Sequence, residues 1–78
     1  MRKKELKVVA AFHTTADAMA AEQACTVHGV PGRLIPVPRT LSAGCGIAWC
    51  SPIEERERLV GALEVDGVEY EQIAEVAV

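Results

Sequence analysis

The pattern of apolar and polar residues divides the chain into short strands and helices. A continuous apolar run over residues 8–12 is typical of a central strand. Residues 15–28 then carry apolar side chains at the spacing of one helix face, namely Ala16, Met19, Ala20, Ala24 and Val27. Thr14 or Thr15 with Asp17 is a helix-start signal, and Gly29 followed by Pro31 is a stop signal.

The middle of the chain predicts two strands joined by a loop. Residues 33–37 have the composition of a strand, but Pro36 and Pro38 have no N–H group, so this strand belongs at a sheet edge. Residues 38–46 form the loop, and residues 46–50 form a third, apolar strand. Trp49 shares a face of this strand with Ile47. The sequence leaves open whether helices cover that face or whether it stays exposed as an interface.

A second helix is predicted directly after the third strand. Ser51 is the expected N-cap, Pro52 the first helical residue and Glu54 the capping-box glutamate. The helix body runs to about residue 63, with Glu54 pairing with Arg58 and with an apolar face made of Ile53, Leu59, Val60 and Leu63. Residues 66–67 read as a turn. Residues 68–71 alternate as a half-exposed strand whose phase shifts near Gln72.

This order of elements, β-α-β-β-α-β, predicts an α+β ferredoxin-like fold, with a four-stranded antiparallel sheet and two helices on one face. In that topology the second strand lies at an edge of the sheet, where Pro36 is tolerated. We expect residues 1–6 to form a flexible tail and residues 7–78 to form a single domain.

Composition and charge exclude several classes of function. The chain has 78 residues, 8 basic and 11 acidic side chains and three aromatic residues, which argues against nucleic-acid binding. No apolar run is long enough for a membrane span, and no signal peptide is apparent, so we expect a cytoplasmic protein. Three cysteines do not form a disulfide framework, and no cofactor is expected.

Cys45 is the candidate functional residue because of its neighbours. It stands between Gly44 and Gly46 in the predicted loop, where glycines let a ligand or partner approach the backbone closely. Nearby positive charge and backbone N–H groups favour the thiolate form of a cysteine. Arg39 is the nearest cation in the sequence, and Arg33 is a second candidate.

The other candidate residues have simpler interpretations. In an extended strand Cys50 lies roughly 16 Å from Cys45, too far for a disulfide, and we expect it to be a small buried residue. Cys25 is expected to be a packing residue in the first helix. His13 and His28 could act as bases, but the sequence places neither near Cys45, and no set of residues has the spacing of a metal site.

The segment Leu34-Ile-Pro-Val-Pro-Arg39, with Leu41-Ser42 and Cys45-Gly-Ile-Ala48, resembles a family of small bacterial selenium/sulfur carrier-like proteins. The resemblance implies that Cys45 holds sulfur or selenium as a persulfide- or perselenide-type adduct. It also implies selenophosphate synthetase, a cysteine desulfurase or a YedF- or TusA-like sulfur-transfer protein as partners. In this interpretation Ser42, Gly44 and Gly46 donate hydrogen bonds to the adduct and Arg39 stabilises its negative charge.

The sequence thus predicts a carrier rather than an enzyme, and two alternatives stay open. One is a thiol-redox protein that uses Cys45 with Cys50, and the other is a structural or ligand-sensing ferredoxin-like module. The sequence does not distinguish sulfur from selenium as cargo, and it leaves open whether the chain forms a homodimer.

Overall fold

A computed structural model describes residues 5–41 and 46–78. The elements follow in the order β1 (Leu6–Ala11), α1 (Thr15–Val27), β2 (Arg33–Pro36), β3 (Ile47–Pro52), the 3₁₀ turn η1 (Ile53–Glu55), α2 (Arg56–Val65) and β4 (Gln72–Ala77). The first described residue, Glu5, exchanges two backbone hydrogen bonds with Val78. Ordered pairing therefore begins inside the segment taken above as the tail.

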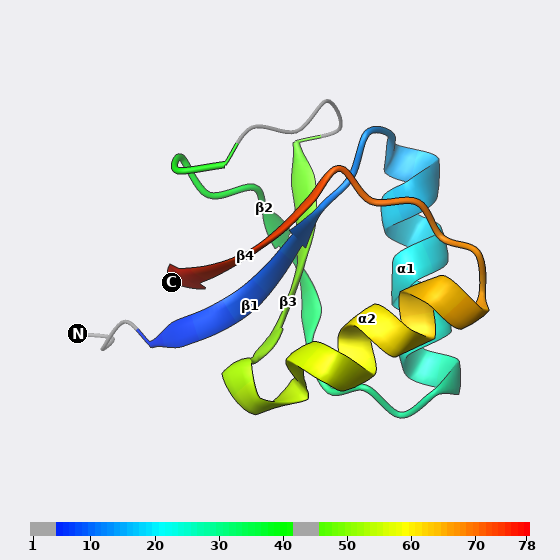
Figure 1. The fold of residues 1–78 in the computed structure, drawn as a ribbon. Coiled ribbons are helices and arrows are strands. Elements are labelled where there is room, and N and C mark those ends of the chain that lie inside the picture. The colour runs from blue at the N-terminus through cyan, green and yellow to red at the C-terminus, as the bar shows by residue number, and fades with distance from the viewer. Residues whose placement is uncertain (1–4, 42–45) are drawn as a thin grey trace.

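The four strands form one antiparallel sheet in the order β2-β3-β1-β4, and both helices lie on the same face of it (Figure 1). The predicted α+β ferredoxin-like fold is therefore confirmed. β2 lies at an edge, where Pro36 stands opposite Ile47. At that position the missing N–H of Pro36 removes no bond from the interior of the sheet.

Helix α1 begins and ends where the sequence predicts, but it turns a different face inward. Thr14 is the N-cap, and its hydroxyl accepts a hydrogen bond from the backbone N–H of Asp17. The buried side chains are small, namely Ala18, Ala21, Ala24 and Cys25. Met19 and Val27, expected on the apolar face, are more than half exposed. The small residues let α1 approach the sheet closely, and that close contact decides which face is buried.

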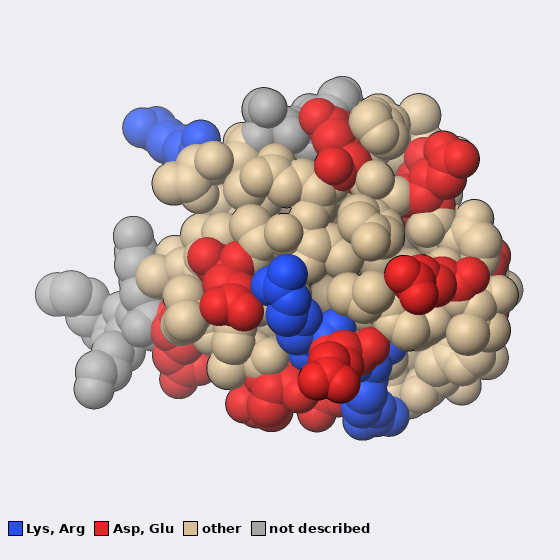
Figure 2. All heavy atoms as spheres, in the orientation of Figure 1, with Lys and Arg blue, Asp and Glu red and all other residues tan. Residues whose placement is uncertain are grey.

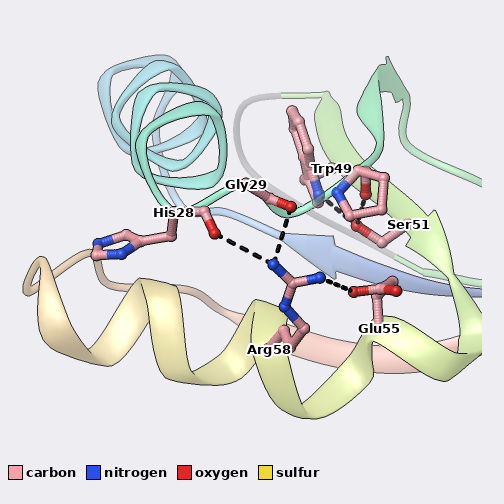
Figure 3. Close-up of polar contacts among 7 residues, drawn as sticks. His28, Gly29, Trp49, Ser51, Glu55 and Arg58 are labelled. Carbon is pink, nitrogen blue, oxygen red and sulfur yellow. Dashed lines mark hydrogen bonds and ion pairs between the residues drawn. The ribbon is translucent and has the colours of Figure 1, made fainter.

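The predicted start of the second helix is wrong, because Ser51 and Pro52 are the last two residues of β3. The buried Ser51 hydroxyl accepts a hydrogen bond from Trp49 Nε1 and donates one to the carbonyl oxygen of Pro31, both at 2.7 Å (Figure 3). Tertiary partners thus occupy the side chain that would have capped the helix. The chain instead enters α2 through η1.

Gly32 lets the chain pass close to this buried pair of hydrogen bonds. Its φ is +150°, and a Cβ atom there would overlap the carbonyl oxygen of Cys50 and lie 2.7 Å from Ser51 Oγ and 2.9 Å from Trp49 Cε2. The edge strand β2 can therefore join β3 in this register only with glycine at position 32.

Arg58 of α2 ties the two helices together. Its guanidinium donates hydrogen bonds to the carbonyl oxygens of His28 and Gly29, at the C-terminal end of α1, and it is ion-paired with Glu55 at 3.0 Å (Figure 3). Carbonyl groups at a helix C-terminus lack partners within the helix, and a cation there is stabilising. The sequence predicted Glu54 as the partner of Arg58, whereas the structure shows Glu55.

The last strand begins later than predicted. Residues 68–71 are not in a strand, and β4 runs from Gln72 to Ala77. Val68 and Tyr70 instead pack against the core under the helices. The alternating pattern of residues 68–71 therefore belongs to the connection between α2 and β4 and not to a strand.

Each face of the sheet carries its own apolar cluster. The helix-covered cluster includes Phe12, Trp49, Leu59 and Leu63. Trp49 is thus under the helices, which settles the question that the sequence left open. We call the opposite side the open face; its cluster is formed by Val9, Leu41, Ala48 and Cys50, with Ile35, Val37, Ala74 and Val76 packed against it.

Candidate functional site

The connection between β2 and β3 carries the residues singled out in the sequence. The structure describes residues 37–41 and Gly46 of it, whereas Ser42, Gly44 and Cys45 lie outside the described residues. The described part runs on the side of the sheet opposite the helices (Figure 1). The candidate site is therefore built from its two described flanks.

Backbone hydrogen bonds hold both ends of this connection. The N–H of Val37 donates to the carbonyl oxygen of Gly46 at 3.0 Å, and the N–H of Leu41 donates to the carbonyl oxygen of Pro38 at 3.0 Å. The first bond extends the pairing of β2 with β3 by one step. The second closes a tight turn, so the chain doubles back over the open face directly after leaving the sheet.

Gly46, the residue that follows Cys45, is exposed and has a φ of +74°. Among the described residues, a Cβ atom at this position would meet no atom within 4 Å. Glycine is therefore favoured here because of the backbone conformation, and not because a side chain would lack space. The glycine expected directly after Cys45 is therefore exposed and has a left-handed backbone conformation.

Arg39 is exposed on the outer surface of the turn. Together with Pro38 and Thr40 it lines a hollow of about 310 Å³, whose other wall is formed by Val76, Ala77 and Val78. Within residues 5–41 and 46–78, its guanidinium has no ion-pair partner. A free cation thus lies six positions before Cys45.

Leu41 anchors the turn to the sheet, and the sequence analysis gave it no role. Its side chain is 9% exposed and packs with Val9, Ala48 and Cys50. The signal that could have revealed it is that Leu41 is the one large aliphatic residue in the loop of residues 38–46. Burial of this leucine fixes the start of the segment that leads to Cys45.

Cys50 lies next to this anchor on the open face and is buried, as the sequence predicted. It stands opposite Val9 of β1 and opposite Arg33 of β2. Burial raises the pKa of its thiol above the ordinary value, while the positive charges of Lys7 and Arg33 act in the opposite direction. The Cys50 thiol is therefore mostly protonated at neutral pH.

Cys25 is the second buried thiol and lies under the helices. Burial raises its pKa to about 11, and no cation opposes this effect. As the sequence predicted, Cys25 is a packing residue. Neither of the described cysteines has the exposed, anion-stabilising surroundings of a reactive thiol.

The chain was compared with the sequence profiles of known protein families. Residues 7–75 match the family described as "Putative Se/S carrier protein-like". The chain belongs to this family. The match extends from β1 to β4 and includes both helices and the whole connection between β2 and β3. No curated protein and no solved structure matches the chain significantly.

The two histidines of this Se/S carrier-like domain form ion pairs with carboxylates. His28 Nε2 lies 3.1 Å from Asp66 Oδ1, which joins the C-terminal ends of α1 and α2. His13 Nδ1 lies 3.6 Å from Glu71 Oε1, beside the start of β4. Both pairs lie at helix or strand ends rather than on the open face. His13 lies two residues beyond Ala11, which stands opposite Ala48, so it is at the same end of the sheet as Gly46.

Two further observations concern metals and membranes. Residues 5–41 and 46–78 contain no group of three or more His, Cys, Asp or Glu side chains that could hold a metal ion. In the same part of the carrier-like domain, neither helix has the length and apolar character needed to cross a membrane.

Proposed function

We propose that this protein is a carrier of reduced sulfur or selenium and that Cys45 holds the cargo as a persulfide- or perselenide-type adduct. The family assignment supports the carrier role. The choice of cysteine rests on one observation: Cys25 and Cys50 are buried with raised pKa values, and Cys45 adjoins an exposed glycine turn. A carrier thiol has to meet its donor and acceptor, which the buried thiols cannot do without opening of the fold.

The loading step is an exchange between a thiolate and a persulfide. The Cys45 thiolate attacks the outer sulfur of a donor persulfide, a new S–S bond forms, and the donor leaves as a thiolate with the electron pair of the broken S–S bond. Arg39 stabilises the negative charge of the adduct, and the backbone N–H groups of Gly44 and Gly46 and the Ser42 hydroxyl donate to it. The cycle closes when an acceptor takes the outer atom, so the protein is a carrier and not an enzyme.

Donor and acceptor are proteins of sulfur or selenium transfer. Selenophosphate synthetase, a cysteine desulfurase and a YedF- or TusA-like protein are the candidates that the family resemblance offers. The free thiols of Cys25 and Cys50 suit the reducing cytoplasm, where we place the protein.

Mass spectrometry after incubation with selenite and a thiol tests the assignment. We expect the wild type to gain one selenium atom per chain, and Cys45→Ala to gain none. Cys25→Ala and Cys50→Ala are matched controls that should load as the wild type does. Loading of Cys45→Ala at the wild-type level, or no loading of the wild type, would refute the proposal.

A second candidate function uses Cys50 as a resolving thiol for Cys45. The observation that favours it is the pair of cations, Lys7 and Arg33, that lower the pKa of Cys50 against the effect of burial. Against it stands the extended conformation of β3 from Ile47 onward, which carries Cys50 away from the loop. A non-reducing peptide map after mild oxidation decides between the two functions: a Cys45–Cys50 disulfide supports redox chemistry, and separate peptides support the carrier.

A further inference from the structure

Charged side chains are distributed unequally between the two sides of the sheet. All eleven acidic residues lie within the described part of the chain, because residues 1–4 and 42–45 contain no Asp or Glu. Ten of them belong to the helices, to η1, to the connection between α2 and β4, or to Glu75 of β4, and only Glu5 precedes β1. In Figure 2 red side chains lie over the helices and also over the strands at the left, and a blue side chain stands apart where the turn after β2 lies.

The arginines on the helix side are ion-paired. On the open face Lys7 is ion-paired with Glu5 at 3.3 Å, whereas the two arginines there are not. Arg56 is ion-paired with Glu75 at 3.2 Å, and Arg58 with Glu55 at 3.0 Å. Across the described ranges, Arg33 and Arg39 form no ion pair. Arg33 is exposed and stands opposite Cys50, which belongs to the open-face cluster.

The surface between these two arginines is mainly apolar, and the ion pair of Lys7 with Glu5 lies beside Val76. Ile35, Val37, Ala74 and Val76 are partly exposed around the buried centre of the open-face cluster. The hollow beside Arg39 continues this surface, since Val76 lines it. A surface with an apolar centre and a charged rim is the usual arrangement of a protein–protein interface.

We propose that the open face, from Arg33 across Ile35 and Val76 to Arg39, docks an acidic surface of the protein that exchanges cargo with this carrier. Unpaired arginines around an apolar centre are complementary to carboxylates around an apolar patch. A second copy of the chain fits less well, because a symmetric contact through this face brings the Arg33 and Arg39 side chains of both copies together. Positive charge here also steers an acidic partner toward the loop that contains Cys45.

This inference rests on the proposed function only in naming the partner as the protein that exchanges cargo with the carrier. The docking itself can be measured without any transfer of sulfur or selenium. The probes are two synthetic peptides with the same apolar residues, one with glutamate and one with lysine at every charged position. Each is titrated into ¹⁵N-labelled Cys45→Ser protein at low ionic strength, and amide chemical shifts are followed. We expect the glutamate peptide to shift the amides of Arg33, Ile35 and Val76 and to leave Glu57 and Gly61 of α2 unchanged.

Substitutions of single arginines then test whether their charges contribute to the binding of the glutamate peptide. Arg33→Gln and Arg39→Gln should each weaken binding of the glutamate peptide about two- to five-fold, the range for an exposed ion pair. Arg56→Gln removes the same charge on the helix side and should leave the affinity unchanged. Raising the ionic strength to about 0.5 M should abolish most of the difference between the peptides.

Four results would overturn the proposal: equal or tighter binding of the lysine peptide, shifts centred on α1 or α2, no shifts with the glutamate peptide, or a dimer in sedimentation whose interface maps to the open face. Loss of selenium loading with docking intact would refute the proposed function alone. Loading by Cys45 without docking would refute only the surface inferred here.

Discussion

The two faces of the sheet differ in what covers them and in how their charges are arranged. Under the helices lie large, fully buried side chains, including Phe12, Leu59 and Leu63, and the arginines outside them are ion-paired. Among the described residues, Leu41 of the turn after β2 packs on the open face, and Arg33 on that face has no ion pair. The difference indicates that most of the stability comes from the helix-covered face and that the open face is the one free for the docking we propose.

The same contrast holds for the two buried thiols, because each face contains one of them. Cys25 lies under the helices, where burial alone sets its pKa. Cys50 lies on the open face, where Lys7 and Arg33 oppose the effect of burial. The positive charges on the open face thus offset part of the effect of burial, although the pKa of Cys50 remains raised.

The largest expected effect compares one leucine from each face. Leu59→Ala, in the helix-covered core, should lower the free energy of unfolding by about 4 kcal/mol, and Leu41→Ala, on the open face, by about 2 kcal/mol. The reason is that fewer neighbours surround the cavity left at position 41. Urea unfolding measures both, and Leu6→Ala is the control, since Leu6 is 53% exposed and should lose less than about 0.5 kcal/mol. Equal losses at 41 and 59 would remove the distinction between the faces.

Gly32→Ala should destabilise the protein by about 3 kcal/mol or more, because the new methyl group overlaps the backbone of β3. Gly61→Ala is the matched control. Its Cβ atom meets nothing within 4 Å, and alanine in a helix should add up to about 1 kcal/mol of stability. Thermal or urea unfolding compares the two. A tolerated Gly32→Ala would mean that β2 does not approach β3 as described.

Ser51→Ala should cost about 2 kcal/mol, because it leaves the buried Trp49 Nε1–H and the Pro31 carbonyl oxygen without this partner. Trp49→Phe removes the donor instead. If the hydrogen bonds form one unit, the double variant should lose less stability than the sum of the single variants. Additive losses in urea unfolding would show that Ser51 acts through its own contacts only.

The free energy of unfolding should depend on pH through the ionisation of the Cys25 thiol. With a pKa raised from 9.0 to about 11, the folded protein holds this proton more tightly than the unfolded chain does. The associated stability is therefore fully present below pH 9 and is lost as the pH rises toward 11, by about 2 kcal/mol. Cys25→Ala lacks this contribution, so the difference between its unfolding curve and that of the wild type isolates the effect. A difference that does not change between pH 9 and 11 would contradict the assignment.

The smallest effect concerns Cys50. Arg33→Gln removes one of the charges that lower the pKa of this thiol, so its alkylation in the native protein at about pH 9 should slow about two-fold. Alkylation of Cys25 should not change, because it lies under the helices on the other face. Peptide-resolved mass spectrometry separates the two rates. An equal slowing of both thiols would indicate a general change in stability rather than a local charge effect.

Local patterns in the sequence predicted most of the fold correctly. The apolar run at residues 8–12, the Thr14 cap and the turn at Gly67 all lie where they were predicted. Pro36 predicted the edge position of β2, because a missing N–H is a property of the residue itself. The same holds for Gly46, the glycine that follows Cys45, which adopts a left-handed backbone conformation.

The failures share one cause, which is competition from a distant partner. Ser51 has the best local signal for a helix cap, yet Trp49 and Pro31 occupy its hydroxyl. Met19 and Val27 match the helical spacing, yet the smaller Ala18 and Ala21 face the sheet. Leu41 received no role, because Val9, Ala48 and Cys50, its buried partners, lie on two strands, β1 and β3, that only the folded sheet brings together.

The sequence by itself determined the order of elements, the edge strand and the cysteine that stands between two glycines. These features depend on backbone chemistry within a few residues, so neighbouring letters suffice to read them. Only the tertiary structure decided which face of α1 is buried and that Cys50 lies beside Lys7 and Arg33. It also decided that Arg56 and Arg58 are ion-paired, whereas Arg33 has no ion pair among the described residues. Those properties arise from contacts between segments far apart in the chain, and their energies exist only after the sheet has assembled.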